Sequence, residues 1–411
     1  MFIAKLAWRN IWRNKRRSLI VILSIVVGVS ASLLNDSYGV GIMNQMVDNL
    51  IKSHDSNVQI HKSGFRDNKK VNDVIPNSNR IKSILGKLND IKGYSERVIC
   101  FGLISSAANS SGVSIVGIKP ELEKNVTDIY KKIIAGRYLS NGRNEIVISK
   151  KVAEKLEVEI GDKLVAVASD VNGNVSSQMF RVIGIYRSGI SEYDNINIYI
   201  PLADAQEMLN LGDNIHEIAV SIEDYRKSSE LKDKILTEFN KNDIVKDIYE
   251  VKTFQEIMPM MIAFLDVYHQ MSYVIYLIIG IAVLFGVVNT MLMTVMERIN
   301  EFGVIMSIGI RRGKLLRMIM YESLFMGLLG TIIGFIVGLL IYYPMSVNGV
   351  DMSQFSESMA SFGLPNQIYP ELNMNVVINT LLIIPLVTVI AGIFPAIKAT
   401  RLQPSEAVRF V

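Results

Sequence analysis

The chain has 411 residues, of which 50% are hydrophobic and 20% charged, with a net charge of +4 and a mean hydropathy of +0.30. This composition excludes an ordinary soluble protein and also a protein that lies mostly in lipid, so it predicts membrane spans joined to a water-soluble domain. The single cysteine, Cys100, excludes an intramolecular disulfide framework and a cysteine-rich metal site. The four histidines lack metal-ligand spacing, so no bound metal is expected.

Four long windows of the sequence contain no Lys, Arg, Asp or Glu. They cover residues 18–35, 270–296, 323–350 and 372–397. Each approaches or exceeds the roughly 20 residues that a helix needs to cross a bilayer. We therefore predict four transmembrane helices, at residues 18–45, 267–296, 317–345 and 372–397.

Basic residues are concentrated at alternate ends of these spans. Six precede the first span, with no acidic residue among them: Lys5, Arg9, Arg13, Lys15, Arg16 and Arg17. The loop at 297–316 and the tail at 398–411 are also basic, whereas the loop at 346–371 contains only acidic charges. The positive-inside rule places the N-terminus, the 297–316 loop and the tail in the cytoplasm, and residues 46–266 outside.

Residues 1–17 mix hydrophobic and basic side chains. They predict an amphipathic helix on the membrane surface, with aromatic residues at the interface and cations near anionic lipid. A cleaved signal peptide is the alternative, because a basic front, an apolar run and small residues at 28–32 follow one another. The long, patterned front favours an uncleaved anchor.

The outer segment, residues 46–266, has the pattern of an α/β domain. Runs rich in β-branched residues predict strands at 58–61, 97–104, 113–118, 145–148, 163–167, 180–186, 196–200 and 217–222. Helices are predicted at 77–88, 150–156, 202–209 and 227–240. Asn172, Gly173 and Asn174 predict a hairpin turn. We expect two subdomains, with a strand-rich piece at about 145–200 inserted in the other.

The third span carries glycines at helical spacing. Gly330, Gly334 and Gly338 repeat every four residues, so they lie on one helix face, where another helix can approach closely. Glu322 stands at the start of this span. A carboxylate at the membrane border suggests a specific partner, for which we expect an Arg of the 297–316 loop.

The 297–316 loop mixes charged and hydrophobic residues and is interrupted by Gly309 and Gly313. This pattern fits a short amphipathic helix that lies along the membrane and docks into a groove on a cytoplasmic partner. A plain connecting loop is the alternative.

Four segments resemble the FtsX-like permease domain of ABC transporters, in the FtsX-like/MacB superfamily. Residues 296–309 (MERINEFGVIMSIG) and 319–323 (IMYES) are similar to the family's E-R-x-x-E-[IF]-G pattern and to the glutamate that opens its next span. Residues 8–17 (WRNIWRNKRR) resemble its N-terminal entry, and residues 394–409 (FPAIKATRLQPSEAVR) resemble its ending. These matches bracket the chain in the family's order.

The resemblance implies a four-span permease that dimerises with a second copy or a paralogue and binds cytoplasmic ATPase subunits. ATP and Mg would bind to the ATPase, whose closure would move the long helices and squeeze the outer domains, a mechanism called mechanotransmission. The residues expected to couple to the ATPase are Glu297, Arg298, Glu301, Gly303 and Gly309. The carboxylates and Arg298 would pair with the ATPase surface. This sequence shows no phosphate-binding loop, so we expect neither an enzyme nor a directly bound cofactor.

The outer segment is most similar to the lipoprotein-releasing LolC/LolE branch, at residues 57–61, 115–120, 135–139, 180–189 and 191–206. That branch implies a bacterial inner-membrane protein that extracts lipoproteins from the outer leaflet for a periplasmic carrier. Its carrier-recruiting subunit has a longer loop than residues 168–179 of this chain, so direct recruitment of a carrier stays open. MacB-like efflux of a peptide or drug is one alternative, and FtsX-like signalling to a cell-wall hydrolase is another. Nucleic acid is not an expected partner.

A lipid-bearing cargo would enter between the first span and the second span of the partner copy. The residues expected to line this cavity are Val26, Val29, Leu33, Val40, Met43, Tyr268, Met271 and Ile275. Apolar surface suits acyl chains, and flexible methionine suits varied ones.

Overall fold

The computed structural model describes residues 2–13, 15–76, 78–242, 244, 248–307, 311–361 and 363–401. The chain divides into two compact units. The helical unit combines Met1–Met43, Phe264–Asp351 and Gln367–Val411, and the sheet unit combines Asn44–Ala263 and Met352–Asn366. Of the predicted tail at 398–411, residues 402–411 lie outside the described residues.

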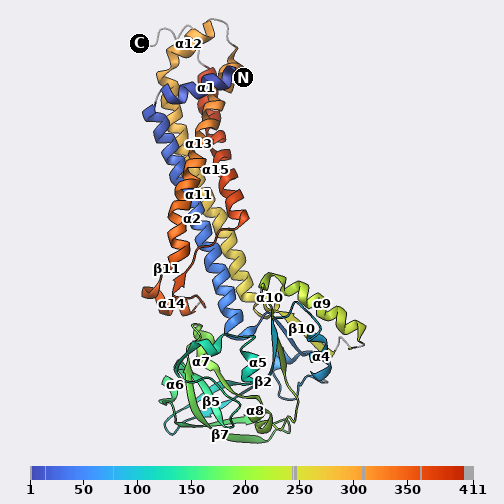
Figure 1. Ribbon diagram of the computed structural model, residues 1–411. Helices are drawn as coiled ribbons and strands as arrows, with labels where there is room; N and C mark the ends of the chain where they lie inside the picture. Colours follow the sequence, from blue (N-terminus) through green and yellow to red (C-terminus); the bar gives the residue numbers. More distant parts are fainter. Residues whose placement is uncertain are drawn as a thin grey trace. The chain divides into compact units, whose positions relative to one another are not determined.

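Four helices are long and apolar enough to cross a membrane (Figure 1). They are α2 (Lys15–Leu50), α11 (Pro259–Glu297), α13 (Arg312–Asn348) and α15 (Met374–Thr400). Each covers all or nearly all of one of the four predicted spans. Because helical hydrogen bonding continues where the side chains become polar, α2, α11 and α13 extend beyond the bounds that hydropathy alone predicts.

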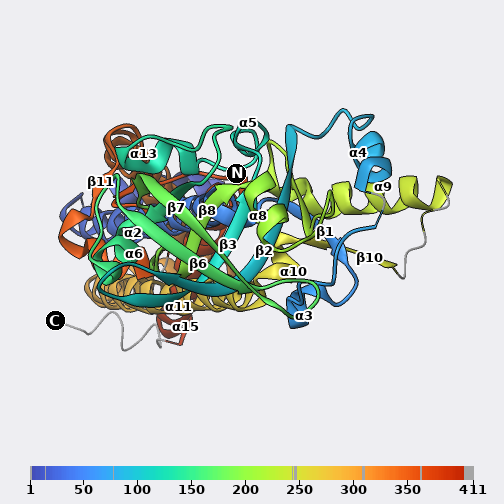
Figure 2. The same cartoon turned by 90° about the horizontal axis from the view of Figure 1, so that it is seen from below.

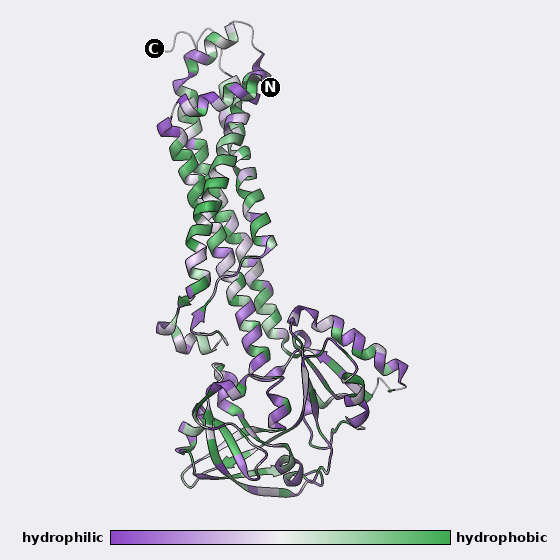
Figure 3. Cartoon of the chain, viewed as in Figure 1, coloured by the Kyte–Doolittle hydropathy of each residue, from purple (hydrophilic) through white to green (hydrophobic). Residues whose placement is uncertain are grey.

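The helices of this bundle are rich in hydrophobic residues, as the green bands along them in Figure 3 show. Large side chains are left exposed on different helices: Leu23 is 50% exposed, Leu277 62% and Leu340 70%. Contiguous exposed apolar surface of this kind is typical of a surface that meets lipid. The charge-free windows of the sequence therefore lie together in the helical unit.

Two shorter helices lie at the end of the bundle where the chain begins (Figure 1). Helix α1 (Phe2–Arg13) packs on the bundle through Ala7 and Ile11, both almost fully buried. Helix α12 (Ile299–Ser307) follows α11 after one residue. Helices are thus confirmed in the N-terminal segment and in the 297–316 loop.

The sheet unit is built on ten strands in one hydrogen-bonded sheet (Figure 2). The strands are β1 (Val58–Lys62), β2 (Gly93–Ser105), β3 (Ser110–Ile118), β4 (Ile133–Gly136), β5 (Glu145–Ser149), β6 (Lys163–Ser169), β7 (Val175–Tyr186), β8 (Asn197–Pro201), β9 (Glu217–Ser221) and β10 (Tyr249–Thr253). Their order is β10-β1-β9-β2-β3-β8-β5-β7-β4, and β6 pairs with β2 and β7. The pairing is mixed, since β3–β8 and β5–β7 are parallel and the other pairs are antiparallel.

All eight predicted strands are present, within a few residues of their expected bounds. Strands β4 and β10 were not predicted, because β4 has only four residues and ends in glycine, and β10 contains the charged residues Glu250 and Lys252. Strands β5 to β8 belong to the same sheet as β2 and β3. The division into two subdomains, with an insertion at about 145–200, therefore stays a prediction.

Short helices connect and cover these strands. They are α3 (Phe65–Asn68), α4 (Ser78–Leu85), α5 (Pro120–Glu123), α6 (Lys150–Leu156), α7 (Ser191–Ile196), α8 (Leu202–Met208), α9 (Ser228–Lys241), α10 (Phe254–Ile257) and α14 (Ser356–Ser361), with the helical turns η1 (Ile51–Asp55), η2 (Ile129–Lys132), η3 (Tyr225–Lys227) and η5 (Ser353–Phe355). The four predicted helices correspond to α4, α6, α8 and α9. A separate two-stranded ribbon pairs β11 (Val350–Asp351) with β12 (Gln367–Ile368).

The predicted hairpin turn joins β6 to β7. Gly173 has a φ of +81°, and the Asp170 carboxylate accepts hydrogen bonds from the backbone N–H groups of Asn172 and Asn174. The strands run up to Ser169 and begin again at Val175, so little of the 168–179 segment protrudes. A tight turn therefore joins the two strands.

Candidate functional site

Seven polar residues meet at the end of the bundle that carries α1 and α12; six belong to five different helices, and one, Arg298, connects α11 to α12. We call them the charge cluster: Asn10, Arg13, Arg17, Glu297, Arg298, Glu301 and Glu322. Three of its members, Glu297, Arg298 and Glu301, are predicted coupling residues. The cluster therefore links the predicted coupling segment to the rest of the bundle.

Arg298 is the centre of the charge cluster. Its Nη1 donates to Glu322 at 3.1 Å, and its Nε donates to Glu301 at 3.0 Å. Arg298 and Glu322 are only 6% and 5% exposed, and the guanidinium lies 4.9 Å from the centre of the Phe302 ring. Because both charges are buried, removal of either one would leave the other buried without a compensating charge. The predicted partner of Glu322, an Arg of the loop, is confirmed.

The N-terminal segment supplies the other half of the charge cluster. The Asn10 side-chain amide donates to Glu322 at 2.6 Å, Arg13 pairs with Glu301, and Arg17 pairs with Glu297. Asn10 and Arg13 have the spacing i, i+3 on α1, which is the signal that could have placed them on one face, whereas Arg17 lies on α2. The sequence analysis did not assign them to the site.

Glu301 is held ionised by its neighbours. Burial acts to raise its pKa, but the hydrogen bonds from Arg13 and Arg298 outweigh burial and keep the pKa of Glu301 below its usual range. A carboxylate in this state carries its negative charge at neutral pH. The Glu301 side chain remains 45% exposed, so it is also accessible from outside the bundle.

The predicted coupling residues differ in their exposure and partners. Arg298 is buried and faces Glu322, so it is not available to pair with an ATPase surface. Glu297 and Glu301 pair within the chain, although both remain partly exposed. Gly303 is buried within α12, and Gly309 lies outside the described residues. The role of these residues in coupling stays a prediction.

The glycine face of α13 packs against α2, as predicted. A Cβ atom added at Gly330 would lie 2.7 Å from the Ile25 side chain, and one at Gly334 would lie 2.8 Å from Val29 Cβ. A Cβ at Gly338 would lie 2.8 Å from Leu33. Real Cβ atoms almost never approach so closely, so only glycine permits this contact.

Three of the predicted cavity residues lie in this packed contact. Val29 and Leu33 are fully buried against the glycine face, and the backbone of Val26 lies at Gly334. They are helix-packing residues in this chain. The sequence pattern could not distinguish the two roles, because a residue that lines a lipid cavity and one that packs on a neighbouring helix are both apolar.

The other five predicted cavity residues have mixed environments. Met43 is buried, Val40, Tyr268 and Ile275 are half-buried, and Met271 is 52% exposed. Tyr268 lies directly over Gly39, since a Cβ there would overlap its hydroxyl. Their role in a cavity stays a prediction.

An apolar groove does run between α2 and α11, with a volume of about 540 Å³. It is lined by Ile20, Leu23, Ser24, Val27, Gly28, Ala31, Ile279, Ala282 and Val283. None of these is a predicted cavity residue, although they lie on the same two helices. The groove is nearer the N-terminal end of α2 than the predicted lining.

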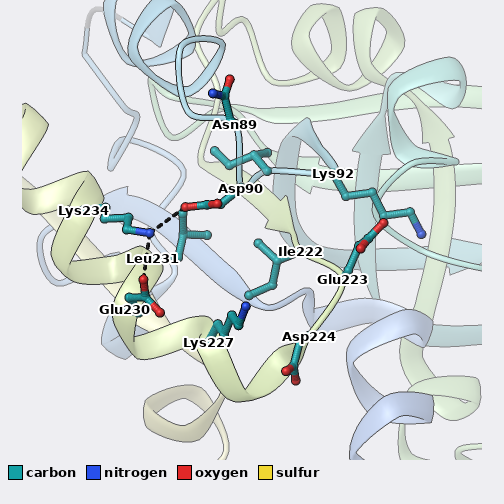
Figure 4. A pocket seen from close by; sticks show the side chains of 11 residues that line it. Asn89, Asp90, Lys92, Ile222, Glu223, Asp224, Lys227, Glu230, Leu231 and Lys234 are labelled. Carbon is teal, nitrogen blue, oxygen red and sulfur yellow. Dashed lines mark hydrogen bonds and ion pairs between the residues drawn. The ribbon is translucent and has the colours of Figure 1, made fainter.

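A second hollow, of about 390 Å³, lies in the sheet unit beside α9 (Figure 4). Its lining is mostly polar, and Lys234 pairs there with Asp90 at 2.6 Å and with Glu230 at 2.8 Å. These charges neutralise one another at an exposed surface. In the part of the chain that the structure describes, no three His, Cys, Asp or Glu residues come together as a metal site.

Comparison with known proteins identifies both parts of the chain. A family model described as MacB-like periplasmic core domain matches residues 18–238, and one described as FtsX-like permease C-terminal matches residues 273–404. Together they match most of the sheet unit and most of the helical unit.

Relatives are similar at low identity over most of the chain. The lipoprotein-releasing system transmembrane protein LolC of Neisseria meningitidis is 22% identical over 75% of each chain. The ABC transporter permease YknZ of Bacillus subtilis is 24% identical over 99% of this chain and 98% of its own. The macrolide export ATP-binding/permease protein MacB of Campylobacter jejuni is 25% identical over 98% of this chain but 60% of its own.

Among solved structures, the periplasmic region of MacB from Actinobacillus actinomycetemcomitans matches 51% of this chain and 94% of its own, with a TM-score of 0.37 and 17% identity. The family models decide the assignment, since one of them alone covers more than half of the chain. The chain belongs to the FtsX-like/MacB superfamily of ABC transporter permeases and combines membrane helices with an extracytoplasmic domain.

Proposed function

We propose that this chain is the permease subunit of an ATP-driven transporter that releases lipoproteins from the outer leaflet of a bacterial inner membrane. ATP is bound with Mg and hydrolysed by a separate cytoplasmic ATPase subunit. The permease works as a dimer, with a second copy or a paralogue. The observation that carries the coupling part of this proposal is the charge cluster, because it joins the predicted coupling segment to two long helices.

The charge cluster supports transmission of movement as follows. An ATPase that displaces α12 also displaces Glu301 and Arg298, which are bonded to Arg13 and Glu322. Glu322 belongs to α13, whose glycine face is packed tightly on α2. A displacement of α12 is therefore transmitted to α13 and α2 through direct contacts. Closely packed helices move together because their contact surface has little room to slide.

The proposed topology follows the basic residues. The N-terminus, α12 and the tail lie in the cytoplasm, and the sheet unit lies in the periplasm. The charge cluster then stands at the cytoplasmic membrane border, where an ATPase can reach the exposed part of α12. Exposed Val304 and the half-exposed Glu301 are available at that surface.

The proposed cargo follows from the relatives and the groove. LolC, by its printed name, belongs to a lipoprotein-releasing system. The apolar groove between α2 and α11 is of a size and polarity that suit acyl chains. A lipid-anchored protein needs only its acyl chains to be accommodated, so its polypeptide need not cross the membrane.

Reconstitution tests this proposal directly. The full chain, its ATPase and a labelled triacylated lipoprotein are placed in liposomes, and the lipoprotein found in the soluble fraction with a carrier is measured. We expect release that depends on ATP hydrolysis. Retention of the lipoprotein in the membrane whether or not ATP is hydrolysed would contradict the cargo assignment.

Export of a peptide or small molecule is the second candidate function, and the β6–β7 turn favours it. The turn leaves no long loop with which to recruit a periplasmic carrier. MacB relatives of this chain are named for macrolide export. Deletion of the gene that increases drug susceptibility while lipoproteins remain correctly localised would favour export. An FtsX-like role in activating a cell-wall hydrolase predicts instead that a hydrolase co-purifies with the chain.

A further inference from the structure

The basic residues at the start of the chain fall into two sets. Arg13 and Arg17 pair with Glu301 and Glu297 in the charge cluster. The second set is exposed and forms no ion pair with any described residue: Lys5, Arg9, Lys15 and Arg16. The charge cluster therefore accounts for only part of this positive charge.

Lys5 and Arg9 share one face of α1 with both tryptophans. Trp8 and Trp12 are 42% and 50% exposed, and their rings meet edge to face at 6.1 Å. The opposite face, with Ala7 and Ile11, is buried. We call the exposed side, formed by Lys5, Trp8, Arg9 and Trp12, the outer face of α1. Interleaved indoles and cations are typical of a helix at the level of lipid headgroups.

The contacts of Trp8 place this face at the membrane border. Its ring lies 5.6 Å from the ring of Phe325 on α13, edge to face. Phe325 lies just inside the charge-free window that begins at residue 323, and the first such window begins at residue 18, five residues after α1 ends. An indole beside the first apolar turn of a span is at the depth where interfacial aromatic residues gather.

We propose that the outer face of α1 binds anionic phospholipid headgroups. Lys5 and Arg9 pair with the phosphates, and the two indoles lie among the headgroups and the first carbons of the acyl chains. Charge complementarity selects this occupant, because a cationic face at a membrane border is attracted by anionic lipid. Each basic residue near such a surface raises the affinity by about fivefold.

Bound lipid also bears on the charge cluster, a consequence that rests on the proposed function. Asn10 and Arg13 lie on the same helix, on the flank that faces Glu322 and Glu301. Lipid that holds α1 at the surface keeps these two side chains in contact with their partners. The content of anionic lipid then regulates how well α12 is linked to the bundle.

The two tryptophans of the outer face are the only ones in the chain, so tryptophan fluorescence reports on this face alone. The full chain is placed in phosphatidylcholine nanodiscs that contain the same fraction of either brominated phosphatidylglycerol or brominated phosphatidylcholine. We expect stronger quenching by the brominated phosphatidylglycerol. High salt should remove the difference, because it screens the attraction.

A double variant and a matched control complete the test. Lys5→Gln with Arg9→Gln should quench equally with the two lipids, whereas Lys150→Gln with Lys155→Gln, two lysines of α6 in the sheet unit, should keep the preference. Equal quenching in the unaltered chain, or an undiminished preference in the Lys5/Arg9 variant, would overturn the proposal. No ATPase or cargo is present, so a failure here leaves the proposed function untouched, and a failure of lipoprotein release leaves this result untouched.

Discussion

Arg298 Nη1 lies 3.1 Å from Glu322 Oε1, and this ion pair joins the residue after α11 to the buried side of α13. Neither partner has appreciable access to solvent. Asn10 donates to the same carboxylate oxygen, so three segments that are far apart in the sequence share one acceptor. A single carboxylate thus fixes α1, the start of α12 and α13 relative to one another.

Removal of Arg298 should strongly destabilise this end of the helical unit. Arg298→Ala leaves Glu322 buried with Asn10 as its remaining partner, and the loss of one member of a buried ion pair costs about 3–5 kcal/mol. We expect a clear fall in the thermal unfolding midpoint of the full chain in detergent. Arg298→Met combined with Glu322→Met removes both charges, so it should recover part of the loss. If the double variant is as unstable as Arg298→Ala, packing rather than charge pairing is responsible.

Glu301→Lys should abolish coupling to the ATPase while leaving the stability of the chain nearly unchanged. The carboxylate is 45% exposed, so its ion pair with Arg13 contributes only about 0–1 kcal/mol and the variant should fold and insert normally. The new lysine repels Arg13 and Arg298, which should release α12 from α1. We expect ATPase activity that no longer responds to cargo.

The matched control for that variant is Glu357→Lys, which reverses an exposed charge on α14 in the sheet unit. It should leave the cargo response of the ATPase unchanged. A normal cargo response in Glu301→Lys would remove Glu301 from the coupling path.

The contact between α2 and α13 should not tolerate a side chain on the glycine face. Gly334→Leu places atoms where Val29 Cβ and the Val26 backbone already lie, 2.8–3.0 Å from the new Cβ, so the two helices must separate. Overpacking in a close-packed interior typically costs about 1–3 kcal/mol. We expect a lower unfolding midpoint and accelerated cleavage by protease in detergent.

Gly280→Ala is the control for this contact. Its Cβ would meet Val387 at 3.6 Å, an ordinary van der Waals distance, so the unfolding midpoint should change little. Equal effects of the two substitutions would show that glycine is needed for helix flexibility rather than for close approach.

Much of the fold could be predicted because charged side chains are unfavourable in lipid. A span cannot contain many charges, so charge-free windows located all four long helices. The Glu322 partner was also predictable, since a carboxylate at a membrane border has few possible cations nearby. In the sheet unit, β-branched runs marked eight strands. β4 has only four residues and ends in glycine, and β10 contains Glu250 and Lys252, so neither forms such a run.

The site was harder to predict because its members meet only in three dimensions. The spacing of Asn10 and Arg13 on α1 acquires meaning once α1 is seen to pack on α13. Likewise, Val29 and Leu33 are apolar whether they face lipid, cargo or glycine, so their sequence pattern is the same in each case. Sequence patterns predict which residues share one face of a helix, but only the tertiary structure shows what that face contacts.

The sheet unit contains a buried ion pair that protonation at low pH would break. The stability of the sheet unit should therefore depend on pH. Arg97 on β2 donates to Glu217 on β9 at 2.7 Å and to Glu123 at 2.6 Å, and all three residues are at most 2% exposed. Burial acts to raise the pKa of Glu217, but the Arg97 charge and the His61 hydrogen bond outweigh it and hold that pKa far below its usual range. A depressed carboxylate pKa stabilises the folded state above the unfolded pKa, about 4.3, and this stabilisation is lost as the pH falls below it.

Hydrogen–deuterium exchange of β2 and β9 in the full chain measures this effect. Protection, after correction for the intrinsic exchange rate, should be constant near neutral pH and should decrease as the pH falls below about 4.3. Arg97→Ala should lower protection at neutral pH by about 3–5 kcal/mol, because two carboxylates are then buried without their cation. Lys150→Ala, on the exposed side of α6, serves as the control and should change little. Unchanged protection of β2 and β9 in Arg97→Ala would mean that the ion pair does not hold these strands together.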